Sequence, residues 1–219
     1  MDILQQHEKF EIEVLDLLHR SRILDPLVFG GGTMLRLCHE LNRYSVDLDF
    51  WFIKEVQETE FFANAKQLLA KNYELTDSQI KNFSMILELR STTYPKRLKI
   101  EIRRKKTDMD FQESIAFSRF STHQVLIKAL TLEQSMKNKV SAFLDRGEIR
   151  DSFDIEFLLR RGIELPHLDQ DSLERFQNKL NKFKQTDFKV KLGSILEQDM
   201  RRYYISRGFA YLQEKLRSL

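Results

Sequence analysis

The sequence predicts an α+β fold in which a β-sheet with flanking helices is followed by a C-terminal helical bundle. Strand-like and helix-like segments alternate up to about residue 125, and apolar residues then follow a helical period. Hydrophobic residues make up 42% of the chain and charged residues 32%, as in folded globular proteins. A chain of 219 residues can form two small domains, which we expect at 1–125 and 126–219.

The first predicted elements are a helix, a short strand and a second helix. Apolar residues within the first twenty positions have the spacing of an amphipathic helix, and Pro26 ends it. The apolar run 27–29 predicts a buried strand that leads into three consecutive glycines. Residues 33–41 then have helical spacing.

The next predicted elements are a strand, a helix and a β-hairpin. Residues 47–53 alternate, with Leu48, Phe50 and Phe52 on one face and two aspartates on the other. Residues 56–71 predict a helix. Residues 83–89 and 97–103 read as two strands of a hairpin.

From about Leu126 onward, the apolar spacing predicts helices throughout. The first two are marked by Leu132 to Phe143 and by Phe153 to Leu158, and Gly162 is suited to end the second. Further helices are expected between Leu173 and Phe183 and in the tail from Val190.

Several functional classes are excluded by simple features of the sequence. No apolar run approaches the roughly 20 residues that a membrane helix needs, and the first residues do not resemble a secretory signal. The single cysteine, Cys38, excludes an internal disulfide, and the five histidines have no metal-ligand spacing. We therefore expect a cytoplasmic protein without a membrane partner.

The glycine turn and the following strand carry the main chemical signal. Three of the seven glycines are consecutive, and Gly31, Gly32 and Thr33 open a helix whose first N–H groups can approach phosphate oxygens. Asp47 and Asp49 project from one face of the next strand. Paired carboxylates beside such a turn suit a divalent metal that carries a nucleoside triphosphate.

A third carboxylate is expected from a neighbouring strand, because two-metal sites need several converging acids. Glu101 and Glu88 both lie between apolar residues. We favour Glu101, since its strand alternates better; the alternative is that these glutamates only pair with cations on an exposed face.

Two blocks of motifs resemble the AbiEii/AbiGii-type toxin nucleotidyltransferase family, a branch of the DNA polymerase β-like nucleotidyltransferase superfamily. The first block is Gly-Gly-Thr-Met-Leu-Arg-Leu followed by Asn-Arg-Tyr-Ser-Val-Asp-Leu-Asp-Phe. The second runs from Lys139 to Arg146 and from Arg150 to Asp154, similar to the family's Lys-x-x-Ala-x-x-x-Arg and Asp-x-x-Asp motifs. The resemblance implies a mixed sheet of the nucleotidyltransferase type.

The resemblance also implies roles for individual residues. Asp47 and Asp49 would hold Mg²⁺ or Mn²⁺, joined by Glu101, which the strand pattern and not the resemblance supplies, and Lys139 would contact the triphosphate. These four are the expected catalytic residues. The residues expected to bind the nucleotide are Gly31, Gly32, Thr33, Arg43, Ser45, Lys139, Arg146, Asp151 and Asp154.

The helical spacing supports Lys139 independently of the resemblance. Lys139 and Arg146 lie two turns apart and share one face of a helix, from which cations could reach phosphates. The alternative is a solvated helix face, or salt bridges from Arg146 and Arg150 to Asp151 and Asp154.

The implied activity is transfer of a nucleoside monophosphate from an NTP, the substrate, to the 3′ end of an RNA. The resemblance suggests tRNA as the acceptor and an antitoxin as a further partner. The alternatives are transfer to a protein or small-molecule hydroxyl, and a nucleotide- or partner-binding module without catalysis. The formal net charge of +3 neither requires nor excludes RNA.

Overall fold

The computed structural model describes residues 2–217, which fall into two compact units. Unit 1 comprises the residues up to Glu40 together with Tyr44–Leu130. Unit 2 comprises Leu41–Arg43 and the residues from Thr131 onward. The short segment Leu41–Arg43 therefore belongs to the helical unit although it lies between elements of the sheet unit.

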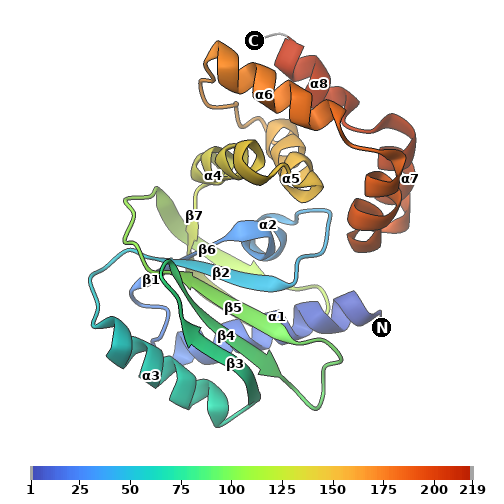
Figure 1. Ribbon diagram of the computed structural model, residues 1–219. Helices are drawn as coiled ribbons and strands as arrows, with labels where there is room; N and C mark the ends of the chain where they lie inside the picture. The colour runs from blue at the N-terminus through green and yellow to red at the C-terminus, as the bar shows by residue number, and fades with distance from the viewer. Residues whose placement is uncertain (1, 218–219) are drawn as a thin grey trace. The chain divides into compact units, whose positions relative to one another are not determined.

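Unit 1 is built on a mixed seven-stranded sheet with the strand order β3-β4-β5-β2-β1-β7-β6 (Figure 1). Two pairs are parallel, β1 with β7 and β2 with β5, and the other pairs are antiparallel. The strands are β1 (Leu27–Gly30), β2 (Asp47–Phe52), β3 (Glu74–Ile80), β4 (Ser84–Arg90), β5 (Leu98–Arg103), β6 (Phe111–Phe117) and β7 (Gln124–Leu130).

Three helices accompany this sheet: α1 (Ile3–Arg20), α2 (Gly31–His39) and α3 (Glu58–Ala70). In Figure 1, α1 and α3 lie on one side of the sheet. The aromatic ring of Phe61 on α3 packs edge-on against Phe52, 5.1 Å between centroids, which identifies the face of β2 that α3 covers.

The two faces of β2 differ as the alternation predicts. Leu48, Phe50 and Phe52 are at most 2% exposed, whereas Asp47 and Asp49 are only partly buried. Neighbouring strands continue both faces, because directly paired residues of a sheet lie on the same side. The apolar face forms the core, and the opposite face of β2 and β5 carries the charged residues.

Unit 2 is helical and has an aromatic core. Its helices are α4 (Leu132–Arg146), α5 (Ile149–Arg160), α6 (Gln170–Asn181), the π-helical turn η1 (Asp187–Leu192), the 3₁₀ turn η2 (Gly193–Ile195), α7 (Gln198–Arg207) and α8 (Ala210–Arg217). The Thr131 hydroxyl caps α4 by accepting from the Gln134 N–H, and Gly147 ends that helix with a φ of 67°. The rings of Phe143 and Phe176, 4.5 Å apart, join α4 to α6.

The predicted α+β class is confirmed, with the sheet first and the helices after it. The hairpin of β4 and β5 is also confirmed, and Leu89 pairs with Leu98 beside its turn. The prediction of helix from Leu126 onward is wrong, because β7 continues to Leu130 and unit 2 resumes only at Thr131. Leu126 is an apolar residue at an exposed position of β7, with a side chain 51% exposed. The run Val125-Leu126-Ile127 therefore lacks the apolar–polar alternation by which a strand is recognised in a sequence.

The strands β3 and β6 are not apparent from the sequence pattern. Both lie at the edges of the sheet, and most of their side chains are exposed or half-buried. An edge strand that buries neither face has no apolar period for the sequence to display.

Candidate active site

The glycine turn joins β1 directly to α2. Gly30 is the N-cap of α2 and has no side chain with which to cap the helix. Gly31 has a φ of 76°, a conformation that favours glycine. A Cβ atom on Gly31 would lie 2.3 Å from Oδ2 of Asp49. The absence of a side chain at Gly31 therefore lets the Asp49 carboxylate lie against the start of α2.

A hydrogen bond ties α2 to the beginning of β2. The Thr33 hydroxyl is fully buried and donates to the Asp47 carbonyl oxygen at 2.6 Å. Gly32 is buried beside it, whereas Gly31 is half-buried. Thr33, predicted to bind the nucleotide, thus holds the backbone of the aspartate strand in this structure.

The parallel pairing of β2 with β5 places Glu101 beside the aspartates. Asp49 pairs with Glu101, and Asp47 pairs with Lys99. All four side chains share the less buried face of the sheet. Neighbouring strands of a sheet lie about 4.7–4.9 Å apart, so Asp49 and Glu101 are neighbours.

Glu88, the other candidate for the third carboxylate, lies one strand further away. It pairs with Lys99 across β4 and β5. Its carboxylate accepts a hydrogen bond from the Thr76 hydroxyl at 2.5 Å. It also accepts one from the Arg97 guanidinium at 2.9 Å, which makes a salt bridge. These contacts lower the pKa of Glu88, the Thr76 hydrogen bond most strongly.

Two cations contact the carboxylate cluster, defined here as Asp47, Asp49 and Glu101. The Lys99 ammonium lies 3.4 Å from Oδ2 of Asp47 and 3.3 Å from Oε2 of Glu101. Arg103 lies 3.1 Å from the other carboxylate oxygen of Glu101. Burial alone would lower the pKa of Lys99, but the charges of Asp47 and Glu101 outweigh burial and raise it.

The chemistry of the cluster suits a divalent cation. Mg²⁺ prefers oxygen ligands and commonly binds through one or two carboxylates together with substrate phosphates. Among residues 2–217, no three acidic, histidine or cysteine side chains converge closely enough to hold a metal by themselves. The donors present therefore fit an ion that takes its remaining ligands from water and a triphosphate.

The predicted site residues of unit 2 form a separate buried ion network. Arg43 donates two hydrogen bonds to the Asp154 carboxylate, at 2.6 and 2.7 Å. Lys139 lies 2.6 Å from Asp154 and 3.4 Å from Asp151. Arg146 donates two further hydrogen bonds to Asp151, both at 2.8 Å.

Burial makes this network strongly interdependent. Both aspartate side chains are at most 1% exposed, and the Arg43 side chain is 3% exposed. Burial alone would raise the pKa of Asp154, but Arg43 and Lys139 outweigh it, so the pKa is lowered. The network holds Leu41–Arg43 to the helices, as does a backbone bridge between Arg43 and Leu196.

The sequence-predicted residues thus divide into two groups. The structure brings Gly31, Asp49 and Glu101 together on unit 1, with Asp47 on the same face. On unit 2 it joins Arg43, Lys139, Arg146, Asp151 and Asp154. Ser45 lies half-buried on the segment that leads to β2.

Lys99 is the residue of this site that the sequence did not single out. By the alternation of β5, Lys99 shares a face of the strand with Glu101. Only the pairing with Asp47 shows that it belongs to the cluster, since that pairing joins positions far apart in the chain.

Two other features are chemically separate from these groups. The Cys38 thiol is partly buried, and burial raises its pKa to about 12, which keeps it protonated and unreactive.

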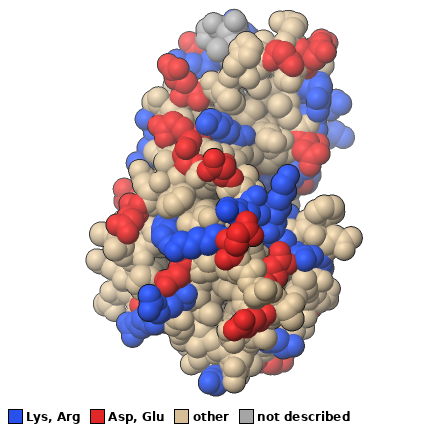
Figure 2. Space-filling model, turned by 90° about the vertical axis from the view of Figure 1, so that its left-hand side faces the viewer, with Lys and Arg blue, Asp and Glu red and all other residues tan. Residues whose placement is uncertain are grey.

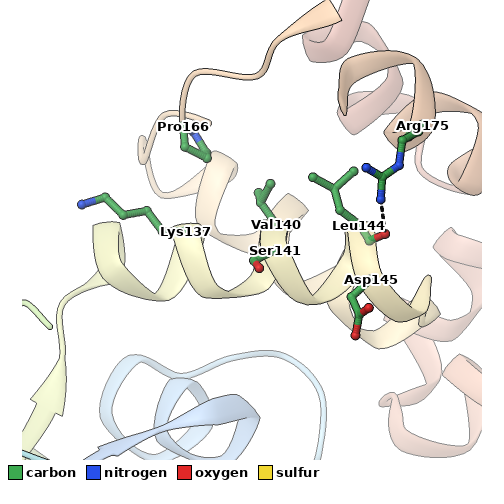
Figure 3. A pocket seen from close by; sticks show the side chains of 7 residues that line it. All are labelled: Lys137, Val140, Ser141, Leu144, Asp145, Pro166 and Arg175. Atoms are coloured by element: carbon green, nitrogen blue, oxygen red, sulfur yellow. Dashed lines mark hydrogen bonds between the residues drawn. The ribbon is translucent and has the colours of Figure 1, made fainter. Parts of the chain in front are cut away.

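An open pocket of about 420 Å³ in unit 2 lies over α4, where Arg175 donates to the Leu144 carbonyl oxygen at 3.2 Å (Figure 3). Its α4 residues face away from Lys139 and Arg146, by the angular spacing of a helix.

The charged surface is mixed in sign. Figure 2 shows acidic and basic side chains next to one another over the face that it presents. This agrees with the modest net charge of +3. Within residues 2–217, no helix has both the length and the apolar composition to cross a membrane.

Comparison with known families gives one match that covers most of the chain. The family described as "Nucleotidyl transferase AbiEii toxin, Type IV TA system" matches residues 14–204. None of the curated proteins matches the sequence.

Solved structures share the fold at low sequence identity. JHP933 from Helicobacter pylori is 20% identical and superposes with a TM-score of 0.55, over 95% of this chain and 93% of its own. MenT4, a nucleotidyltransferase toxin from Mycobacterium tuberculosis H37Rv, is 16% identical with a TM-score of 0.56, over 85% of this chain and 66% of its own. At this identity the likeness supports the fold alone.

Proposed function

Because the chain belongs to the AbiEii family of nucleotidyltransferase toxins of type IV toxin–antitoxin systems, we propose that it modifies RNA. The proposed reaction transfers a nucleoside monophosphate from an NTP to the 3′-hydroxyl of an RNA, with tRNA as the acceptor. It depends on Mg²⁺ or Mn²⁺. The resemblance noted in the motifs is confirmed by the family match, and the chain is a nucleotidyltransferase.

The observation that carries the proposal is the register between β2 and β5. It places Glu101 opposite Asp49, with Asp47 on the same face, and Gly31 leaves room for Asp49 at the start of α2. Carboxylates from two neighbouring strands beside the N-terminus of a helix suit a metal-bound triphosphate.

The proposed reaction is an in-line displacement. The oxygen of the RNA 3′-hydroxyl forms a bond to the α-phosphorus, the bond from that phosphorus to the bridging oxygen breaks, and pyrophosphate leaves with that oxygen. The hydroxyl proton passes to a base. When bound, a divalent metal neutralises phosphate charge and favours the attacking alkoxide.

Each residue of the cluster has a definite task in this proposal. Asp47, Asp49 and Glu101 supply the oxygen ligands, and the backbone N–H groups of Gly31 and Gly32 bind phosphate oxygens. The hydrogen bond from Thr33 keeps the Asp47 backbone in place.

The roles of the unit 2 residues remain predictions from the family resemblance. Lys139 is 12% exposed and ion-paired with Asp154, so in this structure its charge is already compensated. A contact from Lys139 to the triphosphate would require this ion pair to loosen or to share the ammonium. An antitoxin partner follows from the family's toxin–antitoxin membership.

The proposal is tested by following transfer from each of four α-labelled NTPs into total RNA and cell protein, with Mg²⁺ or Mn²⁺. Label is expected in a tRNA-sized band. Replacement of both aspartates, Asp47→Asn with Asp49→Asn, should reduce it by at least about 100-fold, because the metal ligands are lost.

The same experiment separates the other acceptors. Label on protein, or on a small molecule, would replace RNA as the acceptor and keep the chemistry. Absence of label with every nucleotide, metal and acceptor pool would contradict the proposal. Equal labelling by the double variant would show that the carboxylate cluster is not the catalytic site.

A further inference from the structure

Lys99 occupies a chemically distinctive position within the carboxylate cluster. Its ammonium contacts one oxygen of Asp47 at 3.4 Å and one oxygen of Glu101 at 3.3 Å. The contact to Glu101 also satisfies the geometry of a hydrogen bond. One side chain therefore bridges carboxylates that belong to two different strands.

This bridge follows from the sheet and not from a chance side-chain conformation. Lys99 is directly opposite Asp47 in the parallel pair, and Glu101 lies two residues further on the same face of β5. The Lys99 side chain is 35% exposed, compared with 31% for Asp47 and 14% for Glu101. The ammonium is thus partly shielded from water where it meets the two acids.

A divalent metal and the Lys99 ammonium need the same oxygen atoms. Mg²⁺ binds its ligands at about 2.0–2.1 Å, so an ion shared by Asp47 and Glu101 would draw their oxygens together. The ammonium cannot remain between them at the same time, because the space is filled and the two cations repel each other. Metal binding must therefore displace Lys99.

We infer that Lys99 is a displaceable internal cation that competes with free divalent metal for the carboxylate cluster. This inference rests on the proposed function, because it takes the cluster to be the metal site. Lys99 is a positioning residue here: it keeps the acids paired and their charge compensated until the metal arrives together with a triphosphate. The phosphate oxygens then offer the displaced ammonium another anionic partner.

Arg103 does not have the same role. It pairs with Glu101 through the other carboxylate oxygen, and its side chain is 48% exposed. It can stay in place when a metal binds to the oxygen that Lys99 leaves.

The test is the affinity for Mn²⁺ alone, measured by calorimetry or by the paramagnetic resonance signal of free Mn²⁺, without nucleotide. Lys99→Met should raise this affinity by about 3- to 30-fold, the gain expected from removing two partly exposed ion pairs. Lys99→Arg keeps the charge and should stay close to the unaltered protein. Far-UV circular dichroism verifies that each variant is folded.

Arg97→Met is the matched control. It also removes one positive charge from unit 1, at the residue just before β5, but its partner Glu88 lies outside the cluster. Its Mn²⁺ affinity should change much less than that of Lys99→Met. An unchanged or weaker affinity in Lys99→Met, or an equal gain in Arg97→Met, would overturn the inference.

The double variant Asp47→Asn with Asp49→Asn distinguishes the two possible failures. If the unaltered protein binds Mn²⁺ and this variant does not, the cluster is the metal site and the test of Lys99 stands alone. If neither binds, or both bind equally, the metal site proposed above is wrong, and the inference about Lys99 falls with it.

Discussion

Gly31 has a left-handed backbone conformation and also lies against the Asp49 carboxylate of the cluster. Gly31→Ala should abolish at least about 99% of transfer activity, because the new Cβ would lie 2.3 Å from Oδ2 of Asp49 and displace the carboxylate. The measurement is the rate of nucleotide transfer under saturating substrate, with the unfolding midpoint recorded for the same variant.

Gly162→Ala is the control for the backbone strain itself. Gly162 has a φ of 83°, similar to Gly31, but no atom lies within 4 Å of a Cβ built there. Both alanines carry the cost of a left-handed conformation, about 1–2 kcal/mol. Equal loss of activity in the two variants would contradict the proposed contact between Gly31 and Asp49.

The third carboxylate can be tested with a pair of isosteric variants. Glu101→Gln should lower the transfer rate by about 100-fold, because Glu101 pairs with Asp49 and its charge is lost from the cluster. Glu88→Gln should keep most of the activity, because Glu88 contacts Thr76 and Arg97 instead. If Glu88→Gln lost more transfer activity than Glu101→Gln, Glu88 and not Glu101 would be the third carboxylate.

At the scale of elements, the segment Leu41–Arg43 depends on its attachment to α5. Arg43→Met would remove the bidentate partner of the Asp154 carboxylate, which is fully buried, and leave the Lys139 ammonium beside it. Breaking a buried ion pair by removing one partner costs about 3–5 kcal/mol. We expect a loss of this size in the free energy of unfolding, measured by urea titration at neutral pH.

Arg146→Met is the comparison within the same network. Arg146 also donates two hydrogen bonds to an aspartate, but its side chain is 47% exposed, so solvent reduces the strength of the pair. The loss in the free energy of unfolding should be smaller for Arg146→Met than for Arg43→Met. A cost equal to or above that of Arg43→Met would show that burial does not set the energy of the network.

At the scale of the whole molecule, the dependence of stability on pH should reflect a buried acid on α1. Glu11 is 1% exposed, and burial, with the nearby charges of Glu8 and Asp47, raises its pKa well above the ordinary value. Its contribution to stability is therefore complete below the unfolded pKa of about 4.3 and declines as pH rises toward the folded pKa.

Glu11→Gln should remove this decline. The variant should gain stability relative to the unaltered protein as pH rises from 5 to 8, because ionisation of the buried Glu11 carboxyl destabilises the folded state of the unaltered protein. Glu60→Gln, on the exposed surface of α3, should show no such trend. If Glu11→Gln differed in stability from the unaltered protein by the same amount at pH 5 and at pH 8, the pH dependence would not come from Glu11.

The sequence predicted those features that are local in the chain. The glycine turn, the alternation of β2 and the helical spacing of α4 and α5 each appear within a few residues, because strands and helices repeat over short distances. The two motif blocks also sufficed to indicate the family that the comparison confirms. The edge strands escaped prediction because they bury too little to leave a pattern.

By itself, therefore, the sequence determined the order of the elements other than β3, β6 and β7, the family, and the identity of Asp47 and Asp49 as candidates. The tertiary structure alone decided which glutamate stands beside Asp49, and that Lys99 bridges two of the acids. It also decided that Arg43 is buried against Asp154, more than a hundred positions away. The physical reason is that strand register and buried ion pairs join residues whose proximity no local period records.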